Sequence, residues 1–405
     1  MAVTTLDSGI QVLSESIPGV RSAAVGVWVP QGSAHDGEDV LGASHLLEHM
    51  VFRGTQHRSR EQIALALESL GGSLDAFTSR EHTSFQARVL DEHLPQALDV
   101  LADLVLFPTL FDEDLELERR VVLEEISAVE DAPEDFAFEL HGQHLWDRHP
   151  YGTSILGTRD TVSAVEGDSL RDLHRSRYGA GGMVVAATGN VAHDRVVELA
   201  AHYFRSAADG VPETPIPDPG SVEGREVHVR RETAQTHIVT GTVTPPRADR
   251  RRYPLVLLAA AMGGGMSSRL FRRIREELGL AYSVYTFQSF YSRAGISGIY
   301  AGTRHDGAGQ VIDAIREELA TLAREGLPRE DLVQVKSQVK GQIMLSLESP
   351  GARLYRLAGF ALHQEPFTTL DELLSRIDRV TEAEVAESAA EFFHPDRQCL
   401  LRLGP

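Results

Sequence analysis

The order of predicted elements repeats on either side of a proline-rich segment, residues 207–223. Each side begins with β-branched segments typical of strands, passes through a helix-like stretch into further strands, and continues into long amphipathic helices. The helical pattern of residues 97–115 resembles that of residues 311–332. Because one order of elements recurs, the sequence predicts two copies of a single α+β domain.

The segment between the two copies has the composition of an extended linker. Residues 207–223 contain four prolines and two glycines, which favour an extended chain over a packed element. We therefore expect a first domain over residues 1–206 and a second domain over residues 224–405. Each is long enough to bury a core of its own.

Charge and cysteine content exclude several classes of protein. The chain has 39 basic and 59 acidic residues, a net charge of −20, which argues against binding to nucleic acids or anionic membranes. The single cysteine, Cys399, rules out an internal disulfide and a metal site built from several cysteines. No apolar run reaches the ~18 residues that span a bilayer. The start at Met1 does not resemble a signal peptide, so we expect a cytoplasmic protein.

Residues 45–49, His-Leu-Leu-Glu-His, carry the strongest chemical signal. Their flanks suit a helix, with Ser44 as a candidate N-cap. On a helix, His45, Glu48 and His49 lie within an arc of about 100°. Two imidazoles at i and i+4 can chelate one zinc ion, and a carboxylate beside them can take a proton from bound water. This order is that of the inverted zinc-protease motif.

The motif alone leaves one alternative open, which is a polar helix face that binds no metal. A catalytic zinc site has three protein ligands and one open position, so a third ligand is required. The acid-rich stretch from Asp112 to Glu130 is the natural source. Spacing does not select among its glutamates, most of which fit a solvated helix face: Glu113, Glu116, Glu118, Glu124, Glu125 and Glu130.

Residues 45–55 and 118–126 together resemble the pitrilysin family of zinc metallopeptidases, which includes insulin-degrading enzyme and the mitochondrial processing peptidase. The resemblance covers residues 5–400. It implies two homologous α/β-sandwich domains, each a mixed sheet with helices packed on it. It also implies one zinc ion per chain, held by His45, His49 and Glu125.

The same resemblance assigns the catalytic carboxylates. It makes Glu48 the general base that activates a zinc-bound water. It makes Glu118, seven residues before Glu125, a supporting catalytic acid. The second half has no counterpart of the histidine pair and carries Gln342 where the first half has Glu125, so we expect a non-catalytic copy.

Two further segments resemble the family's substrate-binding regions. Residues 73–83 resemble an edge strand to which an extended peptide is added as a β-strand. The substrate-binding residues implied there are Asp75, Ala76 and Phe77; the family usually has asparagine in place of Asp75. Residues 266–283 resemble a second signature, in which Arg275 and Tyr282 can hydrogen-bond a peptide carbonyl and stabilise a developing oxyanion.

The resemblance implies a metalloendopeptidase that hydrolyses unfolded peptides inside an enclosed chamber. Family members with four such domains close around a chamber, so two copies of this chain are expected to form a homodimer whose active sites are shared between subunits. The alternative assembly is a heterodimer with an inactive partner chain. General peptide degradation and dedicated processing of one precursor remain alternative roles.

Two other classes of function account for less of the sequence. A non-catalytic scaffold subunit related to the processing peptidases would be expected to lose the zinc motif, which is complete here. A nucleotide enzyme needs a phosphate-binding loop, and residues 263–265, Gly-Gly-Gly, belong to neither standard motif. The arginine-rich residues 247–252 fit an exposed turn better than an anion site. Zinc content and hydrolysis of an unstructured peptide would distinguish enzyme from scaffold.

Overall fold

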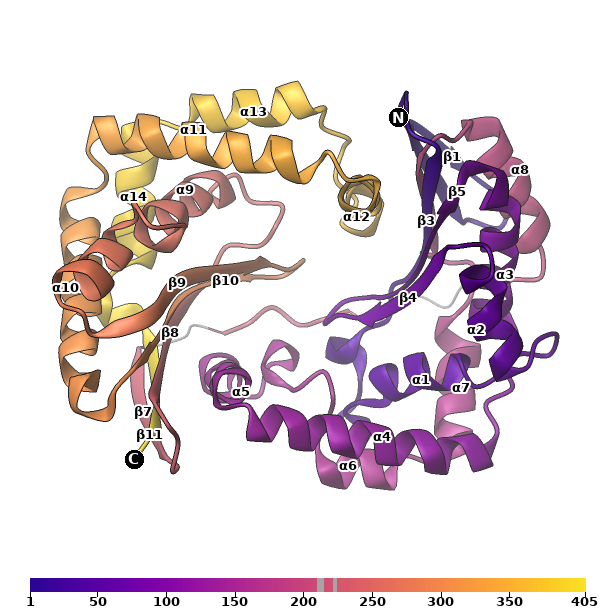
Figure 1. Cartoon of the computed structure of the whole chain (residues 1–405), viewed down its shortest axis with the longest axis horizontal. Helices are drawn as coiled ribbons and strands as arrows, with labels where there is room; N and C mark the ends of the chain where they lie inside the picture. The colour runs from indigo at the N-terminus through magenta and orange to yellow at the C-terminus, as the bar shows by residue number, and fades with distance from the viewer. Residues whose placement is uncertain (210–214, 221–223) are drawn as a thin grey trace. The chain divides into compact units, whose positions relative to one another are not determined.

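The computed structural model describes residues 1–209, 215–220 and 224–405, so residues 210–214 and 221–223 of the predicted linker lie outside the described part. The chain divides into two compact units, each built around one β-sheet (Figure 1). The first unit consists of Met1–Ser127, Thr153–Ile216 and Ser346–Pro366, and the second of Ala128–Gly152, Pro217–Leu345 and Phe367–Pro405. Two α+β units with mixed sheets confirm the predicted fold class.

The sheet of the first unit has six strands in the order β1-β2-β6-β3-β5-β4. β2 and β6 are parallel, and the other neighbours are antiparallel. β4 lies at one edge and pairs with β5 alone. The strands are β1 (Ala2–Thr5), β2 (Gln11–Ser16), β3 (Ser22–Val29), β4 (Ser73–Thr78), β5 (Thr83–Leu90) and β6 (Val184–Gly189).

Side chains alternate between the two faces of this sheet along each strand, and different helices cover the two faces. Val25 and Val27 of β3 enter the main core of the unit. Ala24 and Trp28, on the other face, pack against α12 (Pro350–Leu362). The remaining helices of the unit are α1 (Ala43–Val51), α2 (Arg60–Glu68), α3 (Leu94–Leu106), α4 (Asp112–Asp131), α6 (Arg159–Ala164), α7 (Gly167–Arg177) and α8 (His193–Tyr203), with short turns η1 (Ser33–His35), η2 (Glu38–Val40) and η3 (Asp91–His93).

The sheet of the second unit repeats this arrangement with five strands in the order β7-β11-β8-β10-β9. β7 and β11 are parallel, as β2 and β6 are, and the remaining pairs are antiparallel. The strands are β7 (Arg225–Arg230), β8 (Thr236–Thr244), β9 (Ala281–Phe290), β10 (Gly295–Thr303) and β11 (Cys399–Gly404). Strand order and direction match β2-β6-β3-β5-β4, so the two units are two copies of one fold.

Helices cover the second sheet, and α10 (Ala308–Glu325) is a clearly amphipathic one. α10 buries one stripe that includes Val311, Ile315 and Leu322. The α-helices are α5 (Pro133–Trp146), α9 (Arg252–Gly263), α10 (Ala308–Glu325), α11 (Arg329–Ser346), α13 (Leu370–Arg379) and α14 (Glu382–Phe392). A seven-residue π-helix, η5 (Phe271–Glu277), and the short 3₁₀ turns η4 (Pro150–Gly152), η6 (His305–Gly307) and η7 (Pro395–Arg397) complete the unit. In the part of the chain that is described, no helix combines the length and apolar character needed to cross a membrane. The cytoplasmic location stays a prediction.

Each half of the chain supplies one helix to the other unit. α5, from the first half, packs on β8 and β11, and its Ala137 joins a cluster with Val239 and Tyr300. α12, from the second half, packs on β2, β3 and β6. The compact units therefore differ from the continuous segments 1–206 and 224–405 chiefly by the exchange of Ala128–Gly152, which contains α5, and Ser346–Pro366, which contains α12. An amphipathic pattern shows that a helix has an apolar face, but it does not show which sheet that face covers.

Candidate functional site

The helix α1 presents the predicted motif on one face. Leu46, Leu47 and Met50 are buried in the core of the first unit, which orients the helix. His45 and His49 lie on the other face and remain partly exposed. The periodicity of the sequence thus places the two imidazoles side by side, with ring centroids 4.7 Å apart.

The start of α1 differs from the prediction. Its N-cap is Gly42, whose left-handed φ of 89° favours glycine, so the candidate cap at Ser44 is wrong. Asp36 supplies the capping carboxylate: Oδ2 accepts the backbone N–H groups of Gly42 and Ser44 at 3.1 and 3.3 Å, and Oδ1 accepts the Ser44 hydroxyl at 2.6 Å. Burial raises the pKa of Asp36 to about 6, although these hydrogen bonds lower it.

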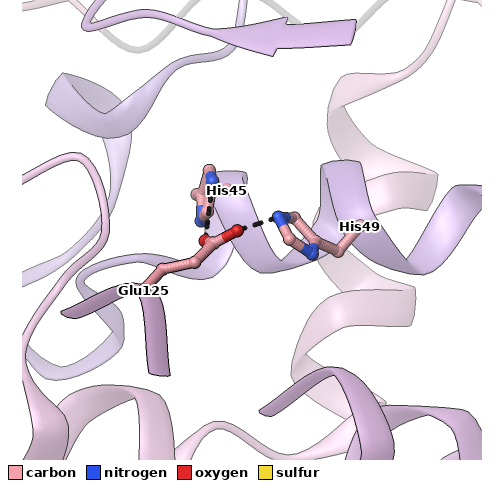
Figure 2. A group of neighbouring side chains, drawn as sticks. All are labelled: His45, His49 and Glu125. Atoms are coloured by element: carbon pink, nitrogen blue, oxygen red, sulfur yellow. Dashed lines mark ion pairs between the residues drawn. The ribbon is translucent and has the colours of Figure 1, made fainter. Parts of the chain in front are cut away.

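Glu125 of α4 completes a group of three potential ligands (Figure 2). Its Oε2 lies 3.8 Å from His45 Nε2 and 3.7 Å from His49 Nε2. Ligand atoms around a tetrahedral zinc ion with bonds of ~2.1 Å are about 3.4 Å apart. The two distances from Glu125 to the imidazole nitrogens are therefore close to the spacing that zinc requires.

The hydrogen bonding of these residues also fits a metal ion. Glu125 Oε2 is buried, and no described residue hydrogen-bonds it. A buried carboxylate oxygen without such a partner, facing two imidazole nitrogens, is a typical zinc donor set. Within the described residues, His45, His49 and Glu125 form the one His, Cys, Asp or Glu group with this geometry. Three protein ligands leave a fourth position open, as in catalytic zinc sites.

Glu118 lies behind His49 and contacts its other ring nitrogen. Its Oε2 accepts a hydrogen bond from His49 Nδ1 at 2.9 Å, which leaves the lone pair of Nε2 directed toward Glu125. Its Oε1 pairs with Arg53. Arg53 was not among the predicted site residues; its position four residues after His49 was the signal that could have indicated it.

The ionisation of this pair follows from its contacts. Burial raises the pKa of Glu118, but the hydrogen bond from His49 and the charge of Arg53 outweigh burial and hold that pKa below its usual range. Burial lowers the pKa of His49, but Glu118 and Glu125 outweigh it and leave that pKa raised. Glu118 is therefore an anionic acceptor suited to orienting His49.

His45 and Glu48 have pKa values shifted by burial. Burial, and then the neighbouring His49, lower the pKa of His45 to about 4, so this imidazole is neutral at pH 7, as a metal ligand must be. Burial raises the pKa of Glu48, although hydrogen bonding with Thr78 and the charge of His49 lower it. A carboxylate with a raised pKa suits a general base.

The predicted substrate strand ends beside Glu48. Asp75, Ala76 and Phe77 lie on the edge strand β4, and the Phe77 side chain is exposed. The next residue, Thr78, donates its hydroxyl to Glu48 Oε2 at 2.5 Å. The structure therefore brings the predicted edge strand and the predicted base into direct contact.

Arg275 and Tyr282 meet in the second unit. The Arg275 guanidinium carbon lies 4.5 Å from the centre of the Tyr282 ring, and its Nη1 donates to the Tyr282 carbonyl oxygen at 3.0 Å. Gly279, with a φ of 62°, allows the turn between η5 and β9 that brings them together. Tyr282 is 75% exposed, so its side chain is available to a ligand.

Comparisons with known proteins match both units. A family model described as insulinase (peptidase family M16) matches residues 11–159, and one described as the peptidase M16 inactive domain matches residues 164–339. A protein named an uncharacterized zinc protease from Streptomyces coelicolor is 38% identical over 409 residues, covering 99% of this chain and 89% of the relative. Another from Bacillus subtilis is 38% identical over 397 residues, covering 97% and 95%.

Solved structures show the same fold at low sequence identity. A peptidase M16 inactive-domain protein from Pseudomonas fluorescens has a TM-score of 0.93 and 20% identity, covering 100% of this chain and 98% of the other. A protease from Helicobacter pylori has a TM-score of 0.91 and 21% identity, covering 100% and 99%. The family models span most of the chain, and relatives named zinc proteases match it nearly end to end. The chain therefore belongs to peptidase family M16, the pitrilysin family of zinc proteases.

Proposed function

We propose that this chain is a zinc metalloendopeptidase that hydrolyses peptide bonds in unfolded peptides. The observation that carries the proposal is the approach of one ligand atom each from His45, His49 and Glu125 to within 4.8 Å of one another, with Glu48 on the same helix as the two histidines. A His₂Glu ligand set with an adjacent carboxylate suits metal-assisted hydrolysis. Membership of a family of zinc proteases supports the same reaction.

Each chain residue has a defined part in this reaction. His45, His49 and Glu125 hold one zinc ion per chain, which when bound supplies Lewis acidity toward the attacking water and the peptide carbonyl. Glu48 accepts the proton that the water loses as it attacks, and returns it to the leaving amine. Glu118 acts through His49, whose ring it holds in the ligating orientation.

The substrate is an extended peptide that pairs with the edge of β4. Its backbone hydrogen-bonds the strand beside Asp75, Ala76 and Phe77, as in β-strand addition. Arg275 and Tyr282 supply donors for a peptide carbonyl. What supports this mode is the contact between the end of β4 and Glu48, because a peptide paired there would run toward the base.

Two copies of the chain form a homodimer that encloses the peptide in a chamber. Each active site then combines the zinc ligands of one chain with Arg275 and Tyr282 of the partner subunit. This assembly is proposed because a single chain carries both sets of residues, one in each of its two units. A heterodimer with an inactive chain is the alternative.

Two substitutions test the metal site. Glu48→Gln should keep zinc near one ion per chain and lose about three orders of magnitude or more of hydrolysis. Glu125→Gln should lose zinc, because it removes a ligand. Glu124→Gln is the matched control, since Glu124 is the exposed neighbour of Glu125 and should change neither property.

Zinc is measured by atomic emission, and cleavage of an unstructured peptide by mass spectrometry. A Glu48→Gln protein that lost zinc, beside a Glu125→Gln protein that kept metal and activity, would contradict the assignment. A wild-type chain that binds zinc but cleaves no unstructured peptide would favour the scaffold subunit.

A further inference from the structure

Thr78 is the last residue of β4, and its side chain points to the interior of the first unit. Side chains alternate along β4, so Leu74, Ala76 and Thr78 face inward whereas Asp75 and Phe77 face outward. Thr78 is 3% exposed and Phe77 is 52% exposed. The same strand thus offers an outward face and a free edge to a peptide, and a buried hydroxyl to the interior.

The protons of two neighbouring hydroxyl groups can be assigned from their partners. Thr83 lies directly opposite Thr78 on β5 and donates its hydroxyl to the backbone carbonyl of Gln31 at 2.8 Å. A carbonyl oxygen can only accept, so Thr83 has no proton left for Thr78, whose oxygen lies 3.4 Å away. The single hydroxyl proton of Thr78 therefore goes to Glu48 Oε2, at 2.5 Å.

This assignment distinguishes the two oxygens of Glu48. Oε2 accepts the Thr78 proton, and a carboxyl oxygen engaged as an acceptor in this way is the less available site for a second proton. The Thr78 hydroxyl is the one side-chain hydrogen-bond donor that the described residues give to Glu48, and the Thr78 backbone adds a second hydrogen bond to the same carboxylate. Oε1 receives no side-chain donor from the described residues, so it is the oxygen that we assign to take a proton from water.

We infer that Thr78 is a positioning residue, whose hydroxyl holds Glu48 so that Oε1 serves as the base and whose backbone ties that base to the strand that receives the peptide. The inference rests on the proposed role of Glu48. Thr78 contacts the base and not the peptide, so its hydroxyl should contribute to the chemical step and little to substrate affinity. Substrate strand and base are then held by one residue.

The test replaces the hydroxyl without changing the shape of the side chain. Thr78→Val keeps a β-branched residue in the strand and removes the donor. Loss of one hydrogen bond to a charged group should lower kcat about ten- to a hundred-fold, with KM changed by less than about twofold. Zinc should stay near one ion per chain. Thr78→Ser, which keeps a hydroxyl, should recover most of kcat.

Thr83→Val is the matched control. It removes an equally buried hydroxyl from the paired residue, but that hydroxyl donates to backbone and not to Glu48. Thermal unfolding should show a comparable loss of stability for both valine variants. Only Thr78→Val should lose kcat; an equal loss in Thr83→Val would overturn the inference, as would wild-type kcat in Thr78→Val or failure of Thr78→Ser to recover.

A binding measurement separates this inference from the proposed function. In Glu48→Gln protein loaded with zinc, the Kd of a fluorescent unstructured peptide, read by anisotropy, should be the same with and without Thr78→Val. A weaker Kd with Thr78→Val would overturn the inference, because Thr78 would then act on the peptide. Full activity in Glu48→Gln protein would overturn both the proposed function and this inference. If Glu48→Gln protein is inactive but Thr78→Val protein is fully active, the inference alone is overturned.

Discussion

Replacing Glu118 by glutamine should weaken zinc binding without removing a zinc ligand. Glu118 accepts from His49 Nδ1 at 2.9 Å and pairs with Arg53, and the three side chains are only 9%, 18% and 11% exposed, respectively. A hydrogen bond to a charged group contributes about 1.5–3 kcal/mol. At about 1.4 kcal/mol per tenfold, losing the charge toward His49 corresponds to zinc binding weakened about ten- to a hundred-fold. Substitutions behind metal-ligating histidines typically fall in this range.

The same substitution should also lower stability in the absence of metal. It leaves the Arg53 guanidinium, which is 11% exposed, without its carboxylate, and breaking one side of a buried ion pair costs about 3–5 kcal/mol. Glutamine keeps an acceptor oxygen, so we expect the lower end of that range. Thermal unfolding of the metal-free protein measures this loss.

The assay for zinc is competition with a chromophoric chelator at pH 7.5, and the control is Glu116→Gln. Glu116 lies on the same helix, is 66% exposed and pairs with Arg119, so its substitution should change zinc affinity by less than about twofold. Wild-type zinc affinity in Glu118→Gln would refute the reasoning. If only stability fell, the contact would be structural and would not orient His49.

Three further predictions concern pH, the second unit and assembly. Burial lowers the pKa of His141 to about 4 in the folded chain, whereas the unfolded chain protonates this histidine near pH ~6.5. Stability is therefore lost as the pH falls from ~6.5 toward about 4. His141→Gln can still donate a hydrogen bond to the Cys399 carbonyl but cannot titrate. Urea unfolding of this variant should therefore show a difference in unfolding free energy between pH 7 and pH 5 that is about 2 kcal/mol smaller than in the wild type, and an unchanged difference would contradict the prediction. Tyr282→Phe keeps the ring against Arg275 and loses only the phenol, so kcat/KM should fall about tenfold with zinc content unchanged; wild-type kinetics would exclude the hydroxyl from substrate binding. Mixing inactive Glu48→Gln chains with inactive Arg275→Ala, Tyr282→Phe chains should restore about a quarter of wild-type activity if sites are shared in a homodimer, and no recovery after demonstrated subunit exchange would contradict sharing.

Local periodicity predicts the histidine pair of the site, and the family resemblance predicts its third ligand. The i, i+4 spacing of His45 and His49 places both imidazoles on one helix face in any fold that keeps the helix. The choice of Glu125 over the other glutamates came from the family resemblance and not from spacing. In the structure, Glu125 faces both Nε2 atoms, whereas Glu118, two turns earlier, is buried against His49 and Arg53.

The contacts that no local rule predicts join residues far apart in the chain. Asp36 caps α1 from a separate turn, and Thr78 reaches Glu48 from a strand thirty residues later. Such contacts depend on how helices and strands pack, and hydrophobic periodicity carries no information about which partners will meet.

The sequence alone determined that the chain contains two copies of one α+β domain, because the order of elements along each half is a local property. Only the tertiary structure decided that α5 packs on the second sheet and α12 on the first. The physical reason is that burial of apolar area is non-directional. An apolar helix face gains similarly from any sheet it can cover, so the choice of sheet belongs to the packing of the whole chain.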